Sequence, residues 1–321
     1  MFAAIFQHRT IEELAHLLRS PDLGYAPATS VVEIRGQGTR PRLYLVHGVG
    51  GGMFWGYSNL ARHLGPDQPL YAFKSRGLDG LPEWPTIEEM AASYIGDLRA
   101  TQPRGPYLLG GYCFGGIVAY EMARQLSEQG EKIELLALIN GSPPNTGYER
   151  DFSLWNPLWQ ARFLGNFAYW LSCFMFRWTW RERREFVRWK FRVLRSRRHE
   201  TEASRGRAEV ALGDVDQLVD LAAYSEERRA LWRAHVKALM LYHPQPYVGR
   251  VTLVRTHGHP MFCSFDYQYG WAELARGGVD VHVVPGGHGN VLAEPHVEAV
   301  ARALDRRLEA IASPRAKGGV A

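Results

Sequence analysis

The sequence has few cysteines, and their number does not suggest a disulfide framework. Its 321 residues include three, Cys113, Cys173 and Cys263. An odd and sparse count favours a reducing compartment over a disulfide-stabilised secreted protein. The apolar residues 1–6 form only a short stretch without a basic leader, so we expect no secretory signal. Both observations predict a cytoplasmic protein.

The sequence also lacks the apolar runs and ligand clusters that two other classes of protein require. The most aromatic stretch, residues 163–176, is interrupted by Gly165, Asn166 and Ser172. It falls short of the roughly 20 apolar residues of a membrane-spanning helix. No group of histidine, cysteine and aspartate has the spacing of metal ligands. We therefore expect no membrane-spanning helix and no bound metal.

Positive charge is concentrated in one segment. The chain carries a net charge of +5, whereas residues 177–198 contain ten Lys or Arg and two Glu, a net +8, which leaves −3 for the remainder. A basic helix with an apolar underside can be an ordinary solvated face, can lie on a membrane, or can bind nucleic acid or an acidic partner. We favour an acidic partner over nucleic acid or a membrane, and the solvated face stays open as an alternative.

One ten-residue stretch has the pattern of a nucleophile elbow. Residues 107–116 read YLLGGYCFGG, an apolar run followed by glycines, one cysteine and an amphipathic helix. The pattern G-x-S-x-G has this strand–turn–helix context, with Cys113 in place of the serine and flanking glycines at Gly111 and Gly115. At a helix N-terminus, Cys113 is expected to be a thiolate. The alternative is a buried structural cysteine.

Two glycine-rich loops complete the pattern of an acyl-transfer site. The strand at 43–46 is followed by His47-Gly48-Val49-Gly50-Gly51-Gly52, where α/β-hydrolases supply one oxyanion N–H. We assign the two donors to Val49 and Phe114, although glycine runs are also typical of plain flexible loops. The strand at 279–284 is followed by Pro285-Gly286-Gly287-His288, which places His288 where the catalytic base of this fold stands.

The order of these motifs predicts an α/β class protein. We expect the α/β-hydrolase fold, with a mostly parallel central sheet flanked by helices and a large helical insertion. The strands are predicted from short apolar and β-branched runs at 31–34, 43–46, 70–73, 107–109, 135–139, 251–255 and 279–284. The long stretch 148–247 interrupts this rhythm with aromatic and basic residues.

Taken together, the motifs resemble the thioesterase domains of nonribosomal peptide and polyketide synthases, from about Arg42 to Ile311. The motifs that carry the resemblance are HGVGG, GYCFGG, LALINGSPP, YHPQPYVGRVTL, YGW and VPGGHGNVL. The resemblance implies that the insertion is a helical lid over the active site. It also implies a substrate carried on the 4′-phosphopantetheine of an upstream acyl or peptidyl carrier domain, with no cofactor in this chain.

The resemblance places the acid of the catalytic triad at Asn140, so two departures coincide. Cysteine replaces serine at 113, and asparagine replaces aspartate at 140. A Cys–His pair can exist as thiolate and imidazolium and then needs only an orienting acceptor, which an amide oxygen can be. Cys-His-Asn is the papain-type triad. Asn140 can instead be a turn-former at a strand end, and Asp266 is then the backup acid.

The expected domain organisation follows from the same resemblance. Residues 1–20 are similar to the last helix of a carrier domain, which suggests a remnant of a larger protein. The remaining segments are a linker with the first strand at 21–40, the first part of the hydrolase core at 41–147, the lid at 148–247, the second part of the core at 248–312 and a disordered tail at 313–321.

The predicted function is terminal release of an acyl or peptidyl chain from its carrier through a Cys113 acyl-enzyme. We expect transfer to an amine or hydroxyl that forms an amide, lactam or lactone, because an acyl group on cysteine remains a reactive thioester. Simple hydrolysis is one alternative, and a catalytically inactive acyl-binding or carrier-docking module is another. In the lid, Arg183, Arg184 and Arg188 are expected to meet the carrier or its substrate.

Overall fold

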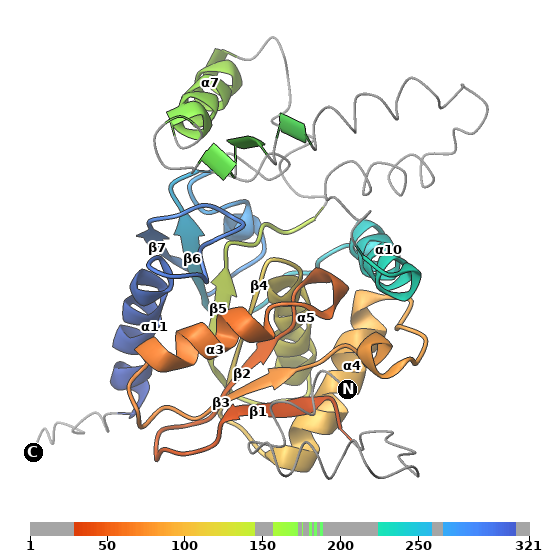
Figure 1. The fold of residues 1–321 in the computed structure, drawn as a ribbon. Coiled ribbons are helices and arrows are strands. Elements are labelled where there is room, and N and C mark those ends of the chain that lie inside the picture. Colours follow the sequence, from red (N-terminus) through yellow and green to blue (C-terminus); the bar gives the residue numbers. More distant parts are fainter. Residues whose placement is uncertain are drawn as a thin grey trace, which may run out of the picture.

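A seven-stranded sheet forms the centre of the molecule (Figure 1). The computed structural model describes residues 29–144, 157–172, 224–258 and 266–312, with single positions between 175 and 188. The strand order is β1-β3-β2-β4-β5-β6-β7. The strands are β1 (Val31–Arg35), β2 (Leu43–Val46), β3 (Leu70–Phe73), β4 (Tyr107–Tyr112), β5 (Ile133–Ile139), β6 (Val251–Thr256) and β7 (Val279–Val284).

Pairing in the sheet is parallel except at one edge. β1 runs antiparallel to β3, and the other pairings between described strands are parallel. The central strands β2, β3, β4 and β6 are buried along their whole length, as near-continuous apolar runs require when helices cover both faces. The predicted fold class, α/β with a mostly parallel sheet, is confirmed.

Four helices cover the two faces of the sheet. α4 (Ile87–Thr101) and α5 (Phe114–Glu128) pack on one face, and α3 (Phe54–His63) and α11 (Val297–Ala312) pack on the other (Figure 1). Thr86 is the N-cap of α4, since its hydroxyl accepts a hydrogen bond from the N–H of Glu89. These two layers hold the strands in place beneath the loops that carry the predicted site.

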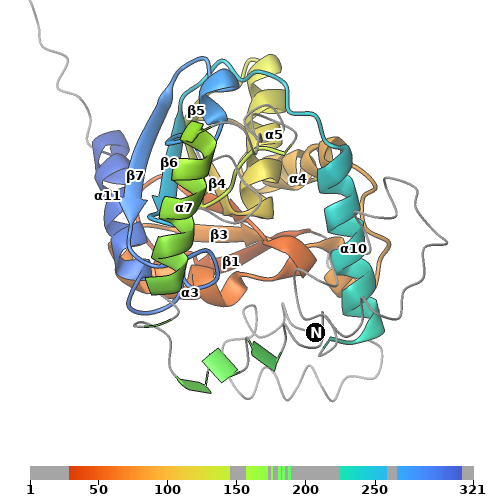
Figure 2. The same ribbon diagram turned by 90° about the horizontal axis from the view of Figure 1, so that it is seen from above.

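Two further helices belong to the insertion predicted at 148–247. α7 (Pro157–Ser172) lies near the ends of β6 and β7, and α10 (Glu226–Leu241) lies on the α4 side of the sheet, as the view from above shows (Figure 2). Within the described segments, no helix combines the length and apolarity needed to cross a membrane. The predicted domain boundaries stay predictions, and residues 1–20 and 313–321 lie outside the described residues.

The predicted elbow forms where β4 meets α5. Cys113 has φ 53° and ψ −115°, a conformation that L-residues rarely adopt. A Cβ on Gly111 would lie 2.3 Å from the backbone carbon of Gly115, and a Cβ on Gly115 would lie 2.2 Å from the Val46 carbonyl oxygen. The strand and the helix can therefore pass only because both positions are glycine.

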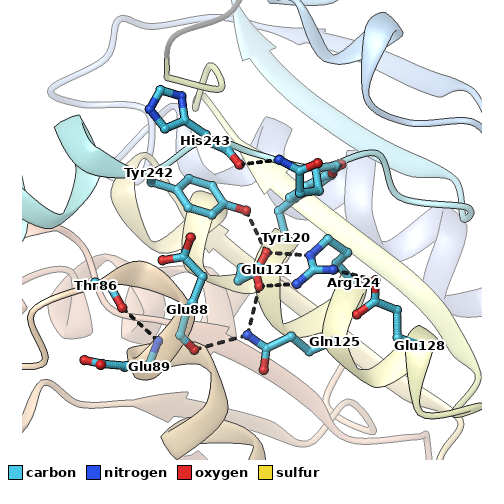
Figure 3. Close-up of polar contacts among 11 residues, drawn as sticks. Thr86, Glu88, Glu89, Tyr120, Glu121, Arg124, Gln125, Glu128, Tyr242 and His243 are labelled. Atoms are coloured by element: carbon cyan, nitrogen blue, oxygen red, sulfur yellow. Dashed lines mark hydrogen bonds and ion pairs between the residues drawn. The ribbon is translucent and has the colours of Figure 1, made fainter.

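A buried carboxylate ties α5 to the segment that follows α10 (Figure 3). Glu121 is 1% exposed, and its oxygens accept hydrogen bonds from Nε and Nη2 of Arg124, each at 2.8 Å. Gln125 Nε2 and the Tyr242 hydroxyl donate to it at the same distance. Burial and the neighbouring carboxylate raise the pKa of Tyr242 far above its usual value, so this hydroxyl stays a donor.

Two glycine-to-alanine variants should separate the elbow from ordinary helix positions. Gly115→Ala forces a methyl group onto backbone atoms, so we expect a loss of at least about 2 kcal/mol in the free energy of unfolding. Gly96→Ala, in α4, places its methyl in open space and should gain up to ~1 kcal/mol. Urea unfolding measures both, and a Gly115→Ala variant as stable as the parent contradicts the close contact at the elbow.

Candidate active site

The three predicted triad residues lie at the carboxyl ends of three parallel strands, of which β4 and β5 are neighbours and β7 is separated from β5 by β6. Cys113 follows β4, Asn140 follows β5, and His288 follows β7. The N–H of Cys113 donates to the Ile139 carbonyl oxygen at 2.9 Å, which fixes the elbow beside Asn140. The hydroxyl of Tyr112 donates to the His288 carbonyl oxygen, and Asn140 Nδ2 lies 3.2 Å from His288 Nδ1.

The side-chain amide of Asn140 has a definite orientation. Its Oδ1 accepts hydrogen bonds from the N–H of Thr256 at 3.2 Å, from the Thr256 hydroxyl at 3.2 Å and from the Tyr269 hydroxyl at 3.3 Å. A backbone N–H can only donate, so the oxygen must face Thr256 and the amide nitrogen must face His288. We expected the amide oxygen to accept from His288; that expectation is wrong, because Thr256 and Tyr269 occupy the oxygen.

The expected thiolate at Cys113 is also wrong. Cys113 keeps a partial opening to solvent, but burial among protein atoms raises the pKa of its thiol to about 11, against a smaller opposing effect of the Phe114 N–H. Burial likewise lowers the pKa of His288 to about 4, against a smaller effect of the Asn140 backbone. The effect of burial on the pKa of Cys113 is larger than the opposing effect of the helix N-terminus. Cys113 therefore rests as a neutral thiol and His288 as a neutral imidazole.

The predicted oxyanion donors are both available. Val49 opens the short 3-10 turn η1 (Val49–Gly51), and Phe114 opens α5. The first N–H groups of a helix have no acceptor within the helix. Among the described residues, no backbone carbonyl accepts a hydrogen bond from either N–H. The N–H of Phe114 instead faces the sulfur of Cys113.

Sequence reasoning missed a group of buried polar residues behind the glycine loop. His47 and His235 are fully buried, and Glu83 is 2% exposed in its side chain. His235 lies in α10, on a stripe with Leu231, Ala238 and Tyr242. That spacing marks the inward face of a helix, so a histidine on an apolar stripe was a readable signal.

The backup acid lies in a turn of its own. The carboxylate of Asp266 accepts hydrogen bonds from the backbone N–H of Gln268 at 2.8 Å and of Gly270 at 3.4 Å. These contacts are typical of an aspartate that stabilises a turn. The contact with Nδ1 of His288 comes from Asn140.

The lid arginines are described only as single positions. Arg183 is partly buried, and Arg184 and Arg188 are exposed. Cys173 and Cys263 lie outside the described residues. Among the described residues, no three or more His, Cys, Asp or Glu side chains are grouped to hold a metal ion.

Comparison with known proteins identifies the family. The sequence profile described as "Thioesterase domain" matches residues 41–308. The chain belongs to the thioesterase domain family. Its α/β-hydrolase elbow, loops and strand order agree with that membership.

Curated relatives of the thioesterase domain are much longer than this chain. Malpibaldin synthetase from Mortierella alpina is 39% identical over 141 residues, which cover 43% of this chain and 2% of that protein. A dimodular nonribosomal peptide synthase from Bacillus subtilis is 37% identical over 142 residues, 43% of this chain and 6% of that protein. The chain thus spans only a small part of the relatives it matches.

Solved structures show the same arrangement. The four-domain nonribosomal peptide synthetase holo-AB3403, bound to AMP and glycine, superposes with a TM-score of 0.61 at 25% identity, over 94% of this chain and 22% of that one. The NocB thioesterase domain, in covalent complex with a fluorophosphonate nocardicin G analogue, superposes with a TM-score of 0.57 at 25% identity, over 87% and 99% of the two chains.

The neutral thiol makes a testable difference to alkylation. With a Cys113 pKa near 11, its reaction with iodoacetamide should accelerate about tenfold per pH unit between about pH 7 and pH 10. Peptide mass spectrometry gives the rate at Cys113, and His288→Ala should keep the same slope. A rate that is already at a plateau at neutral pH would instead indicate a thiolate–imidazolium pair.

Proposed function

We propose that this thioesterase domain releases an acyl or peptidyl chain from a carrier-bound phosphopantetheine thioester through a covalent acyl-Cys113. The observation that carries the proposal is the elbow, where the sulfur of a strained Cys113 lies beside the N–H of Phe114, the first residue of α5. That arrangement is typical of a nucleophile and its oxyanion site. The covalent NocB complex supports it, because a similar domain accepts a covalent adduct.

In the proposed first step, the Cys113 sulfur attacks the thioester carbonyl carbon. A new C–S bond forms as the bond to the carrier sulfur breaks. His288, in the tautomer whose Nε2 is unprotonated, takes the thiol proton of Cys113 and passes it to the departing pantetheine thiolate. The N–H groups of Val49 and Phe114 hold the negative oxygen of the tetrahedral intermediate. Asn140 orients His288 through the contact at Nδ1.

In the proposed second step, an amine or hydroxyl of the acceptor attacks the acyl-Cys113. A C–N or C–O bond forms, the C–S bond breaks, and the acceptor's proton returns to the cysteine sulfur. A thioester keeps more of its driving force than the oxoester that serine would form, and it reacts relatively better with amines than with water. A neutral amine also needs less help from a base than water does, which suits an imidazole whose pKa is about 4.

The proposed partner is the upstream carrier domain of the same assembly line. The relatives are multidomain synthetases, and carrier domains are typically acidic, whereas residues 177–198 carry a net +8. We propose that Arg183, Arg184 and Arg188 guide the carrier toward the site. A reducing cytoplasm, as proposed from the cysteine count, would keep Cys113 as a free thiol.

The identity of the product tests the choice between transfer and hydrolysis. Wild type and Cys113→Ser are compared on one carrier-bound acyl chain, with amine and hydroxyl acceptors supplied. We expect amide or ester from wild type and a larger share of free acid from Cys113→Ser, measured by liquid chromatography and mass spectrometry. Free acid alone from wild type, whatever acceptor is offered, contradicts transfer and leaves hydrolysis.

The direction of the contact between Asn140 and His288 gives a second test of the proposed mechanism. An N–H donor at Nδ1 favours the imidazole tautomer with its proton on Nε2, the nitrogen that would serve Cys113 as a base. Asn140→Asp accepts from Nδ1–H, so we expect acylation to be faster by roughly tenfold. Asn140→Ala removes both the donor and the orienting contact, so it should be slower than Asn140→Asp, yet faster than His288→Ala.

The exposed Asn290 of the same loop supplies the matched control for charge. Its oxygen accepts from the Gly287 N–H, so Asn290→Asp adds the same negative charge without a contact at Nδ1. Stopped-flow acylation with a small thioester should be unchanged in that variant. An inactive Asp266→Ala beside a fully active Asn140→Ala would move the orienting role to Asp266.

A further inference from the structure

His235 of α10 contacts the glycine loop of residues 47–52, called here the oxyanion loop because it carries the proposed donor Val49. The N–H of Gly50 donates to His235 Nδ1 at 2.9 Å, across 185 positions of sequence. Since a backbone N–H can only donate, Nδ1 must be the acceptor and the neutral ring must carry its proton on Nε2. His235 has no exposed surface. The mechanism proposed above does not use this buried group.

A buried carboxylate stands on the other side of the same ring. His235 Nε2 lies 3.1 Å from Glu83 Oε2, and that carboxylate also accepts the hydroxyl of Ser75. Burial alone would raise the pKa of Glu83, but the side-chain contacts with His235 and Ser75 oppose burial and lower this pKa. Glu83 is therefore an anion at neutral pH, and its close approach to Nε2 favours the tautomer with the proton on Nε2, while Nδ1 accepts from Gly50.

Each of the two peptide groups that flank Val49 contacts a different histidine, His47 on one side and His235 on the other. His47 Nδ1 lies 2.7 Å from the Gly48 carbonyl oxygen, which can only accept. That carbonyl and the N–H of Val49 belong to one planar trans peptide, so they point in opposite directions. The next peptide is held through Gly50 N–H by His235. The direction of the Val49 N–H is thus set from both sides.

His235 also contacts the side chain of Phe114, the residue whose N–H is the second proposed oxyanion donor. Its ring stacks on Phe114 with centroids 4.7 Å apart and on His47 at 5.0 Å. Its neighbour in α10, Trp232, leaves no space at Gly50, where an added Cβ would lie 2.1 Å from Trp232 Nε1. One helix therefore packs against the residues of both oxyanion donors.

We propose that His235, held by Glu83, is a positioning residue that fixes the oxyanion loop and links α10 to the Val49 and Phe114 donors. The proposal rests on the proposed function, in which those N–H groups stabilise the tetrahedral intermediate. His235 touches neither the sulfur nor the acyl group in this scheme. It acts through Gly50 and through the ring of Phe114.

The contacts of His235 with Gly50, Phe114 and Glu83 form what we call the His235 clamp. The clamp matters because an oxyanion site works only when its donors are fixed in advance. Loss of one such donor typically lowers the rate by about 10²–10³-fold. Alkylation by iodoacetamide proceeds by direct displacement at carbon and forms no oxyanion. Acylation should therefore depend on His235, whereas alkylation of Cys113 should not. A residue that only supported the local fold would change both rates.

His235→Phe is the direct test, since it keeps a stacking ring and removes both ring nitrogens. We expect single-turnover acylation by a small acyl thioester, followed by intact-protein mass spectrometry, to fall about 10²-fold. Alkylation of Cys113 should stay at the wild-type rate. Binding of an aldehyde that adds reversibly to the thiol should weaken by a similar factor, because its adduct carries the same oxygen. Glu83→Gln, which still accepts from Nε2–H, should lose less.

Tyr242→Phe is the matched control, because it loosens α10 from Glu121 without touching the loop. It should leave acylation, alkylation and aldehyde binding unchanged. Equal losses of acylation and alkylation in His235→Phe, or no loss in either, overturn the clamp. An acyl adduct that still forms in Cys113→Ala overturns the nucleophile and the clamp together. No adduct in Cys113→Ala, combined with undiminished acylation in His235→Phe, overturns the clamp alone.

Discussion

A backbone-to-backbone contact at the elbow determines where everything else in the site lies. Gly111 and Gly115 pass so closely that a single methyl group at either would collide with backbone atoms, and Cys113 is forced into a left-handed conformation between them. This strain is sustained by a fully buried sheet on one side and a buried helix on the other. Asn140 and His288 join Cys113 simply because parallel strands end at a common edge.

Desolvation is the second governing effect. The N–H of Phe114 at the helix terminus favours a thiolate at Cys113, yet burial raises the pKa of this thiol and lowers the pKa of His288, so both groups rest uncharged. Asn140 reinforces this state, since an amide nitrogen at Nδ1 does not stabilise an imidazolium as a carboxylate would. In the proposed transfer reaction, a charge-poor site of this kind would protect the acyl group from water until its acceptor binds.

Local sequence was sufficient for the fold and for the positions of the site residues. The apolar runs predicted the strands within three residues, and the glycine pattern around Cys113 predicted the elbow. Local sequence was insufficient to predict the ionisation states of Cys113 and His288, or which atom of the Asn140 amide faces His288. The pKa of Cys113 depends on packing from several elements, and the direction of the Asn140 amide depends on Thr256, 116 positions away. His235 was missed because its partners, Gly50 and Glu83, are adjacent to it only in the folded chain.

The two attachments of α10 define where the insertion can be exchanged between thioesterase domains. His235 joins the helix to the glycine loop, and Tyr242, just beyond its C-terminal end, joins the chain to Glu121 of α5. The helix is therefore attached to the hydrolase core at two points, although it lies within the stretch predicted as the lid. A chimera that takes a foreign lid should cross over before Ser225, the cap of α10, so that the host keeps its own helix with its own loop. A crossover after Tyr242 would combine the foreign α10 with the host's glycine loop and α5, so the residues that contact Gly50 and Glu121 would come from a different protein.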